Sequence, residues 1–514
     1  MSRWLVGLIL FAGVACGSER PTASRADASA ATALPARLRA DLAFASYWGS
    51  PGGSALRSAV FDAEGNLYIA GGTENPTQWP QTAPATGPLG FFDVIVAKFD
   101  PSGRNLWSLV IGGPGEDYAY VSALDRDGNL LVGGRGGPEF PVTSGAFDAS
   151  FNGGMPVGPH GATDGFLLSL TPGGALRWAT YIGTSGDDII RGIELLASGS
   201  IAVSGGMMEA DDLPTSAGVL KPKSGGAKDA WVAVVKPDGS ALEFLTYFGP
   251  SDDHNLKEDE TLRAIGRDPG GNLWLAGTTQ GTDLAASAGA FQPRRDGGAS
   301  AFVAKLSPDG KRMPYFSWLG GGGDENVETE GFSDAAGAFY IAGGTTSDDF
   351  PATAGASARG SNGDGWVARI EPDGRLGMAA RFGGSSRENF FGPALDAAGN
   401  LFASATSLSA DVPVTSGAPQ PAFGGGGSDA LLVGFDRLGA LAFSTYFGGS
   451  GDDMGRFVAS DPVRNRVVLI GETSSRDLLL RNAAQPTPGA VYFAVFELKP
   501  ATAAPAPATP PAPQ

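Results

Sequence analysis

The chain has 514 residues, including 79 glycines and 37 prolines, and only 18% of its residues are charged. Its 54 acidic and 36 basic residues give a net charge of -18, which repels phosphate backbones and argues against a nucleic-acid partner. A single core rarely reaches this length unless it is built from repeats, and glycine without a three-residue period indicates short strands joined by tight turns.

The first 15 residues predict an export signal. One basic residue, Arg3, precedes an apolar run from Trp4 to Ala15 that is too short to span a membrane as a helix. The residues VACG around Cys16 resemble a lipobox, where bacterial lipoproteins are cleaved and lipidated, although Gly13 departs from that pattern. We expect Cys16, the single cysteine, to carry the lipid; the alternative is an ordinary secretory signal with an incidental cysteine.

The segments on either side of the body are low in complexity. Residues 16–41 are small, polar and aperiodic, which predicts a flexible tether between membrane and domain. Residues 500–514 are rich in proline and alanine and predict an extended tail. The folded body is therefore expected to cover residues 42–499. By resemblance to Gram-negative lipoproteins, the glycine after Cys16 implies residence in the outer membrane.

Three sequence anchors recur through the body. The first is an aromatic or apolar pair followed by glycine, as in YWG, YIG and YFGG, repeated every 63 to 71 residues. The second is a tight turn followed by an alternating strand, as in FDAEGNLYIAGGT, and the third is a strand ending in a Pro-Asp-Gly type of turn. A period of this length indicates a repeat architecture. The glycines of the first anchor are Gly49, Gly112, Gly183, Gly249, Gly320, Gly383 and Gly448.

Each repeat predicts four antiparallel strands, with a tight turn after the first and third strands and a long loop after the second. About seven copies predict an all-β, seven-bladed β-propeller. The last repeat lacks a fourth strand, whereas residues 42–49 look like a fourth strand with nothing before them. We therefore predict that strand 42–49 pairs with strand 491–498 and closes the ring without a free edge.

These motifs, together with EFPVTSGAF from Glu139 and DFPATAGA from Asp349, resemble the bacterial seven-bladed β-propeller repeat family often labelled SBBP. The resemblance covers about residues 42–499. It implies the propeller fold and implies little about function, because the family is defined by its repeat.

Acidic pairs follow the first anchor in most repeats, in the connection from a fourth strand to the next first strand. Because the first strand of a propeller blade is normally innermost, we expect these carboxylates at the mouth of the central channel. A ring that binds Ca²⁺ weakly is one interpretation, and bonding to the backbone of the local turn is the favoured one. The pairs are Glu116 and Asp117, Asp187 and Asp188, Asp252 and Asp253, Asp324 and Glu325, and Asp452 and Asp453, with a weaker Arg387-Glu388.

The remaining candidates are few. Aspartates that open the third strands (Asp93, Asp164, Asp229, Asp364 and Asp429) are expected to be structural. The two histidines, His160 and His254, lie in loops and are too few for an imidazole-rich metal site, and His254 is a candidate for a ligand contact. The strand tryptophans are expected in the core, and Trp79, in a long loop, is the best candidate for an exposed ligand contact.

The sequence favours a non-catalytic binding or scaffold lipoprotein with no cofactor beyond weak Ca²⁺. Its partners would be the membrane, through the lipid, and an unknown surface protein or glycan. The face with the long loops is expected to bind the ligand. The alternative is an extracellular propeller enzyme that acts on polysaccharide or another polymer through acidic residues; the unusual segment SDDHNLKEDE from Ser251 comes nearest to an active-site insertion.

Overall fold

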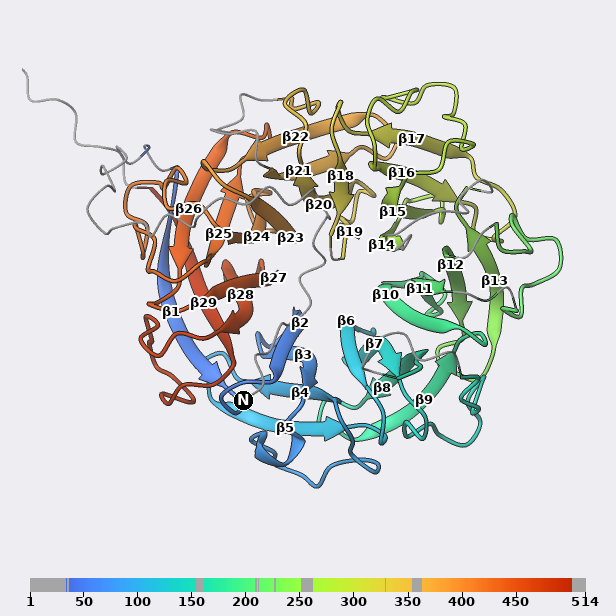
Figure 1. Ribbon diagram of the computed structural model, residues 1–514, viewed down its shortest axis with the longest axis horizontal. Helices are drawn as coiled ribbons and strands as arrows, with labels where there is room; N and C mark the ends of the chain where they lie inside the picture. Colours follow the sequence, from blue (N-terminus) through green and yellow to red (C-terminus); the bar gives the residue numbers. More distant parts are fainter. Residues whose placement is uncertain are drawn as a thin grey trace, which may run out of the picture.

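The computed structural model describes residue 34 and residues 37–153, 161–208, 210, 212–225, 228–250, 262–328, 330–353 and 363–501. These residues form seven antiparallel sheets arranged around a central channel, as Figure 1 shows. The prediction of an all-β, seven-bladed propeller is confirmed. No helix within the described ranges is long and apolar enough to cross a membrane.

The blades follow one another in chain order, and each is built from the channel outward. Blade 1 comprises β2 (Ser54–Phe61), β3 (Leu67–Thr73), β4 (Asp93–Phe99) and β5 (Asn105–Ile111). Blade 2 comprises β6 (Tyr118–Leu124), β7 (Leu130–Gly136), β8 (Asp164–Leu170) and β9 (Leu176–Ile182). Blade 3 comprises β10 (Asp187–Leu195), β11 (Ile201–Met208), β12 (Lys228–Val235) and β13 (Leu242–Phe248). A short 3₁₀ helix, η1 (Pro76–Gln78), lies between β3 and β4.

Blades 4 to 6 follow the same plan, except that the inner strand of blade 5 is broken in two. Blade 4 comprises β14 (Leu262–Arg267), β15 (Leu273–Thr279), β16 (Ser300–Leu306) and β17 (Tyr315–Leu319). Blade 5 comprises β18 (Glu325–Val327), β19 (Phe332–Ser333), β20 (Phe339–Thr345), β21 (Asp364–Ile370) and β22 (Leu376–Phe382). Blade 6 comprises β23 (Glu388–Leu395), β24 (Leu401–Ser407), β25 (Asp429–Phe435) and β26 (Leu441–Phe447).

Blade 7 joins the two ends of the chain. It comprises β27 (Asp453–Asp461), β28 (Arg466–Thr473), β29 (Val491–Pro500) and, outermost, β1 (Leu38–Trp48). The register places Trp48 opposite Val491 and Leu42 opposite Phe496, so the predicted closure between 42–49 and 491–498 is confirmed. Figure 1 shows β1 lying alongside β29.

Apolar side chains fill the space between neighbouring blades. One cluster joins Phe493 and Val495 of blade 7 to Leu56 and Ile95 of blade 1. Three strand tryptophans are fully buried in such clusters, as the sequence predicts. They are Trp231, Trp274 and Trp366.

The outer edge of each blade is covered by its own long loop. In blade 2, the N–H of Thr143 donates to the carbonyl of Ala179 at 3.1 Å, and the N–H of Ala179 donates to Thr143 Oγ1 at 3.0 Å. One hydroxyl residue thus satisfies both backbone groups of an outer-strand residue, which blocks edge-to-edge pairing. The same clamp recurs at Thr82, Ser216, Ser287, Thr353 and Thr415.

This clamp gives the central part of each long loop a structural role. The sequence presents them as the most variable segments, but their central FPVTSGAF-type motif lies against the blade edge. The motif is therefore architectural, and only the parts of each loop on either side of it remain to vary around the channel mouth.

Candidate functional site

The second carboxylate of each described acidic pair is buried, and in four of the five pairs it accepts a backbone N–H from four residues earlier. Asp117 Oδ2 accepts from Gly113 at 2.6 Å, and Asp188 Oδ2 accepts from Thr184 at 2.6 Å. Glu388 and Asp453 make the same bond to Gly384 and Gly449, and Glu325 instead accepts from the hydroxyls of Thr345 and Ser347. This geometry agrees with the favoured architectural interpretation.

The first carboxylate reaches back to the preceding blade. Asp187 accepts the N–H of Thr163 at 2.8 Å, and Asp324 and Asp452 accept from Ala299 and Gly427 at 2.9 and 2.6 Å. Each donor lies just before a third strand, so the bond joins two blades. Glu116 instead pairs with Arg135, and Arg387, which occupies this position in blade 6, is exposed. Asp252 and Asp253 lie outside the described residues.

The position of the pairs differs from the prediction in one respect. The sequence places both carboxylates in the connection between blades, but Asp187, Asp188, Glu325 and Asp453 already belong to inner strands. Their N–H and carboxyl groups form hydrogen bonds to the neighbouring loops. The inner strands therefore begin at these residues and not after them.

The third-strand aspartates complete this arrangement. All five are at most 2% exposed. Asp93 Oδ1 accepts the N–H of Gly90 at 3.2 Å and Asp164 Oδ2 accepts that of Asn152 at 2.8 Å, so the expected structural role is confirmed. The other three, Asp229, Asp364 and Asp429, bond to Gly225, Arg381 and Gly424.

At several blade junctions a third-strand aspartate meets the second carboxylate of the next blade. A Cβ on Gly112 would lie less than 3.0 Å from carboxyl oxygens of both Asp93 and Asp117. Gly448 stands in the same relation to Asp429 and Asp453. The first-anchor glycine is therefore required because two buried carboxyl groups occupy the space of a side chain. Gly383 lies likewise between Asp364 and Glu388.

Burial governs the ionisation of these carboxyl pairs. It raises the pKa of Asp93 to about 6 and that of Asp117 to about 7, and the charge of Asp93 adds to the shift of Asp117. It raises the pKa of Asp429 to about 7, with Asp453 contributing, and that of Asp453 is also raised. Two carboxylates sharing a dry site resist double ionisation, so each pair tends to hold a proton near neutral pH.

The described residues give little support for a metal site at the mouth. They contain no group of three or more His, Cys, Asp and Glu side chains arranged to hold a metal ion. Ca²⁺ takes six to eight oxygen ligands, whereas each junction offers two carboxyl groups already bonded to backbone. Weak cation binding at these carboxylates remains a prediction.

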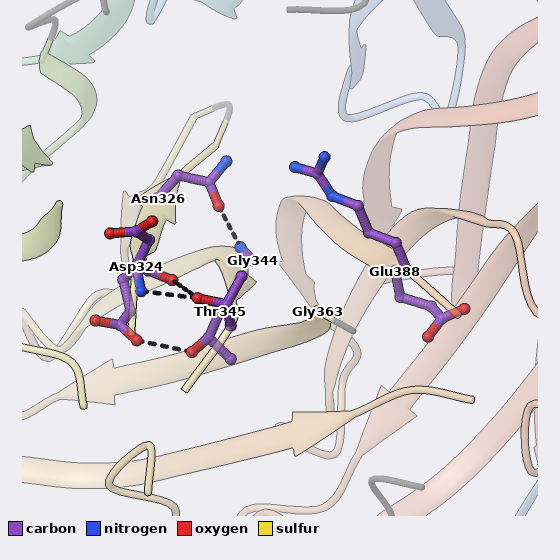
Figure 2. Close-up of a pocket in the computed structure, with 9 residues that line it drawn as sticks. Asp324, Asn326, Gly344, Thr345, Gly363 and Glu388 are labelled. Carbon is purple, nitrogen blue, oxygen red and sulfur yellow. Dashed lines mark hydrogen bonds between the residues drawn. The ribbon is translucent and has the colours of Figure 1, made fainter. Parts of the chain in front are cut away.

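A small polar cavity of about 180 Å³ lies at the junction of blades 5 and 6. Figure 2 shows Asp324, Asn326 and Thr345 on one side and Gly363 and Glu388 on the other. The Glu388 carboxylate points away from the Asp324 side, which agrees with its bonds to the Gly384 N–H and the Ser407 hydroxyl. The acidic residues that line this cavity do not face one another across it.

The channel interior holds a polar group of residues that the sequence did not single out. Most inner strands contain a β-bulge near their mouth end, and the bulged residue is an arginine in four blades. These residues are Arg57, Arg191, Arg263 and Arg456. The repeated arginine in LRS, IRG, LRA and GRF was visible in the sequence, but only the register shows that it is the bulged residue.

These arginines contact residues of neighbouring blades around the channel. Arg57 and Arg456 both pair with Glu472, and Arg263 pairs with Glu328 at 3.4 Å. The Arg191 guanidinium lies 3.9 Å from the centre of the Tyr120 ring. We define the channel collar as Arg57, Tyr118, Tyr120, Arg191, Arg263, Asn326, Glu328, Asn389, Arg456 and Glu472.

Glu330 crosses the channel below the collar. It sits in the break between β18 and β19 with φ of 24°, and its carboxyl lies close to the Ser58 hydroxyl and the Ser122 backbone. Those serines belong to blades 1 and 2, which do not adjoin blade 5 (Figure 1). Burial raises the pKa of the Glu330 carboxyl well above its usual value.

The remaining predicted residues have different outcomes. Trp79 is only 3% exposed, and its ring packs edge-on against Trp48 with centroids 6.4 Å apart, so the prediction of an exposed contact is wrong. The ring can seat there because Gly49 has no side chain; a Cβ would meet it. Cys16, His160 and His254 lie outside the described residues.

Fold and site together define a seven-bladed β-propeller whose mouth carboxylates bond to the blade junctions and whose channel carries a collar of polar and aromatic residues. No family model matches the chain. It is 26% identical over 297 residues to the regulatory protein FlaEY of Caulobacter vibrioides. That alignment covers 54% of this chain but only 28% of the relative.

Solved structures show similarity at low identity. A Dyadobacter fermentans protein of unknown function aligns with 90% of this chain and 99% of its own at 10% identity and a TM-score of 0.42. Hydrazine synthase of Kuenenia stuttgartiensis aligns with 80% of this chain and 91% of its own at 11% identity and a TM-score of 0.43. An acylaminoacyl peptidase of Pyrococcus horikoshii matches 83% of this chain and 50% of its own at 8% identity, with a TM-score of 0.40. Similarity at this level carries no inference about activity.

Proposed function

We propose that the chain is a non-catalytic binding or scaffold protein, held at the cell surface by a lipid on Cys16, with SBBP-type repeats forming its body. The observation that carries the proposal is the bonding of the mouth carboxylates, because acids that hold the backbone of blade junctions are poorly placed for acid–base chemistry. The face around the channel mouth then remains as a binding surface for a surface protein or glycan.

The route of the tether supports this use of the mouth face. The N–H of Leu34 donates to Val414 and that of Arg37 donates to Ala442, both on the outer rim of blade 6. These two contacts place the described end of the tether at the rim of blade 6. The Caulobacter relative is a regulatory protein, which is compatible with a non-catalytic role, but this chain spans less than a third of that protein.

Exposed apolar side chains on the two faces allow a matched test. Leu408 and Leu479 follow second strands on the mouth side and are 51% and 45% exposed, whereas Leu438 and Val463 lie in tight turns on the opposite face and are 77% and 83% exposed. The full chain with Cys16→Ser would be titrated against immobilised envelope polysaccharide and envelope protein. Leu408→Ser with Leu479→Ser should weaken binding at least tenfold, and Leu438→Ser with Val463→Ser should not. Equal loss from both pairs would contradict a mouth-face ligand.

Anchoring needs a separate experiment. Cys16→Ser should move the protein from the detergent-extracted membrane fraction to the soluble exported fraction. A mutant that stays with the membrane would show that lipidation is not the anchor.

The competing hypothesis is a propeller enzyme that hydrolyses a polysaccharide. Its nearest support is the cavity of Figure 2, which has three acidic lining residues, Asp324, Glu325 and Glu388. Glycoside hydrolysis uses two carboxyl groups facing each other across the scissile bond, and the outward direction of Glu388 disfavours that arrangement. Polysaccharide hydrolysis by the full chain that disappears in Glu388→Gln would favour the enzyme and refute our proposal.

A further inference from the structure

We propose that the cavity between blades 5 and 6 binds the carboxylate of an acidic sugar unit, held by Arg387 and by the N–H of Gly363. The inference rests on the proposed binding function, because it names a site on the mouth face and the chemical class of the glycan. Its starting point is a break in the repeat. Blade 6 carries an arginine where blades 3, 5 and 7 carry the first carboxylate of an acidic pair, namely Asp187, Asp324 and Asp452.

The first carboxylate normally satisfies a backbone N–H of the preceding blade. Asp187 accepts the N–H of Thr163 at 2.8 Å, and Asp324 accepts that of Ala299 at 2.9 Å. Thr163 and Ala299 each come directly before a third strand, and Gly363 holds the same position directly before β21. The N–H of Gly363 is therefore the group that a first carboxylate of blade 6 would bind.

The blade 6 junction keeps the rest of this geometry. The N–H of Glu388 donates to the carbonyl of Gly363 at 3.0 Å, as that of Asp188 donates to Thr163 at 2.9 Å. Arginine has no acceptor atom in its side chain, so Arg387 cannot replace the carboxylate. Gly363 is buried, and none of the described residues accepts its N–H. A buried N–H without an acceptor is rare, and this one lines the cavity.

Arg387 places a second donor group at the same point. A Cβ on Gly363 would lie 3.4 Å from Arg387 Cγ, so the arginine side chain starts directly beside that glycine. Arg387 is exposed, and its guanidinium forms no ion pair within the described part of the chain. A guanidinium presents five N–H donors in a planar fork that matches a carboxylate. Together the guanidinium and the backbone N–H provide two points of attachment for one carboxylate.

The acidic residues nearby do not exclude an anion. Blades 3 and 7 already hold a carboxylate at this position, directly before the second carboxylate and without an arginine. Blade 6 adds a positive charge there, which makes the position more favourable for a carboxylate. The Glu388 carboxylate is itself bonded to the Gly384 N–H and the Ser407 hydroxyl and points away from the Asp324 side (Figure 2).

The rest of the wall favours a sugar over a protein side chain. No large apolar side chain among the described residues lines the cavity, and the residues not yet discussed offer amide, hydroxyl and backbone groups. These residues are Asn326, Gly344, Thr345 and Thr346. A sugar acid has hydroxyl groups around its carboxylate, whereas the carboxylate of a protein side chain has an apolar stem. The volume of about 180 Å³ is below the roughly 300–1,000 Å³ of pockets for larger ligands, so the cavity suits a single sugar unit.

The experiment titrates the purified full chain with sodium D-galacturonate and sodium D-glucuronate at fixed ionic strength, by calorimetry and thermal melting. D-galactose and D-glucose are the neutral counterparts. We expect saturable binding of at least one uronate, at least tenfold tighter than that of its neutral counterpart, and a melting temperature that rises with its concentration. Saturable binding of neither uronate, or equal binding of a uronate and its neutral counterpart, would overturn the proposal.

A polymer comparison tests the class of ligand. Polygalacturonate should bind the full chain, and poly-L-glutamate of similar length should bind at least tenfold more weakly. Stronger binding of poly-L-glutamate that depends on Arg387 would assign the cavity to an acidic protein and overturn the sugar assignment.

Two substitutions of one residue separate binding from structure. Arg387→Gln removes the charge and should weaken uronate binding at least tenfold. Arg387→Asp restores the residue of blades 3, 5 and 7, so its carboxylate should bind the Gly363 N–H in place of the ligand. We expect it to abolish uronate binding while the melting temperature stays equal to or above that of the parent.

The control variant is Arg375→Gln, since Arg375 pairs with Asp373 in an exposed tight turn of blade 5. It should bind uronate as the parent does. Unchanged uronate affinity in both Arg387 variants would overturn the proposal, and so would a melting temperature that falls equally in both, because that result indicates a structural role for the arginine.

The outcome is separable from that of the proposed function. Loss of envelope binding in the Leu408→Ser and Leu479→Ser protein with normal uronate affinity would leave the cavity site intact. Envelope binding that survives in Arg387→Asp would refute the cavity inference alone.

Discussion

Two junctions of the ring are held together in different ways: the junction between blades 6 and 7, and the closing junction between blades 7 and 1. At the first, Asp429 and Asp453 lie buried on either side of Gly448. At the second, the equivalent positions carry Ala490 and Ser54, as the register with Thr473 and Thr73 shows, and no carboxyl pair exists. The closing blade relies instead on the ten paired positions between β1 and β29.

The edge clamp differs in the same place. Thr415 clamps Ser444 in blade 6 through its N–H and its hydroxyl, whereas Arg481 and Ala45 in blade 7 exchange two backbone bonds of 2.7 and 3.2 Å. Polar groups inside the repeat thus fix neighbouring blades locally, while closure depends on pairing between distant parts of the chain. Local contacts form at lower entropic cost than the closure of a loop of several hundred residues.

Removal of β1 should have the largest effect. Deleting residues 38–48 exposes the whole outer edge of β29 and part of the apolar cluster that holds Phe44 and Trp48. We expect aggregation or loss of cooperative unfolding, measured by size-exclusion chromatography and thermal melting. A monomeric deletion variant with an unchanged, sharp melting transition would show that the closing strand is dispensable.

Substitution in the carboxyl pair should have the next largest effect on stability. Asp453→Ala leaves the N–H of Gly449 and the hydroxyl of Ser475 without their acceptor, which we expect to cost about 1–3 kcal/mol in the free energy of unfolding. Ser54→Ala, at the closing junction, loses only the contact to Thr73 Oγ1 at 2.8 Å and should cost about 1 kcal/mol or less. Denaturant unfolding measures both. Equal costs would remove the distinction between the two junctions.

The edge clamp should have a smaller effect. Thr415→Val keeps the backbone bond to Ser444 but removes the hydroxyl, and we expect a loss of about 1 kcal/mol by denaturant unfolding. Arg481→Ala, at the matching position of blade 7, keeps its backbone bonds and should cost less than half of that. A larger loss in the arginine variant would contradict the role assigned to the hydroxyl.

The carboxyl pairs also predict a pH dependence. Because burial raises the folded-state pKa of Asp429 to about 7, above its usual value of 3.8, the folded state holds a proton that the unfolded state releases. The stabilisation is complete below about pH 4 and is lost as the pH rises to about 7. The melting temperature of Asp429→Asn, compared with that of the parent, should therefore be higher at pH 8 than at pH 5. A stability difference that does not vary with pH would contradict the raised pKa.

Calcium should have the smallest effect. With two carboxyl groups per junction, millimolar calcium should raise the melting temperature by only about 1 °C. Asp452→Asn combined with Asp453→Asn should reduce that small shift without abolishing it, because the carboxyl pairs of the other junctions remain. A tight, stoichiometric calcium site by calorimetry would contradict the structural role of the mouth carboxylates.

Much of the architecture follows from local pattern. Turn glycines have positive φ where the anchors place them, as at Gly65 and Gly310, and the aspartates that open third strands are structural. The prediction for Trp79 failed because loop position suggests exposure, while the space above Gly49 that accepts the ring is set by another part of the chain. The FPVTSGAF motif is recognisable as a repeat element, but its hydroxyl bonds to a strand 36 residues away in sequence (Thr143 to Ala179), and this bond leaves no local signal.

By itself the sequence determined the number of repeats, the four-strand unit and the closure of the ring. Strand periodicity, turn residues, an orphan fourth strand at one end and a missing fourth strand at the other are all local features. Only the tertiary structure decided that acidic residues of adjacent blades meet around one glycine, that Glu330 crosses the channel, and that four bulged arginines share the collar. These properties depend on the register and rotation of separate blades, which determine the distances between side chains far apart in the chain and so their pKa values and charge balance.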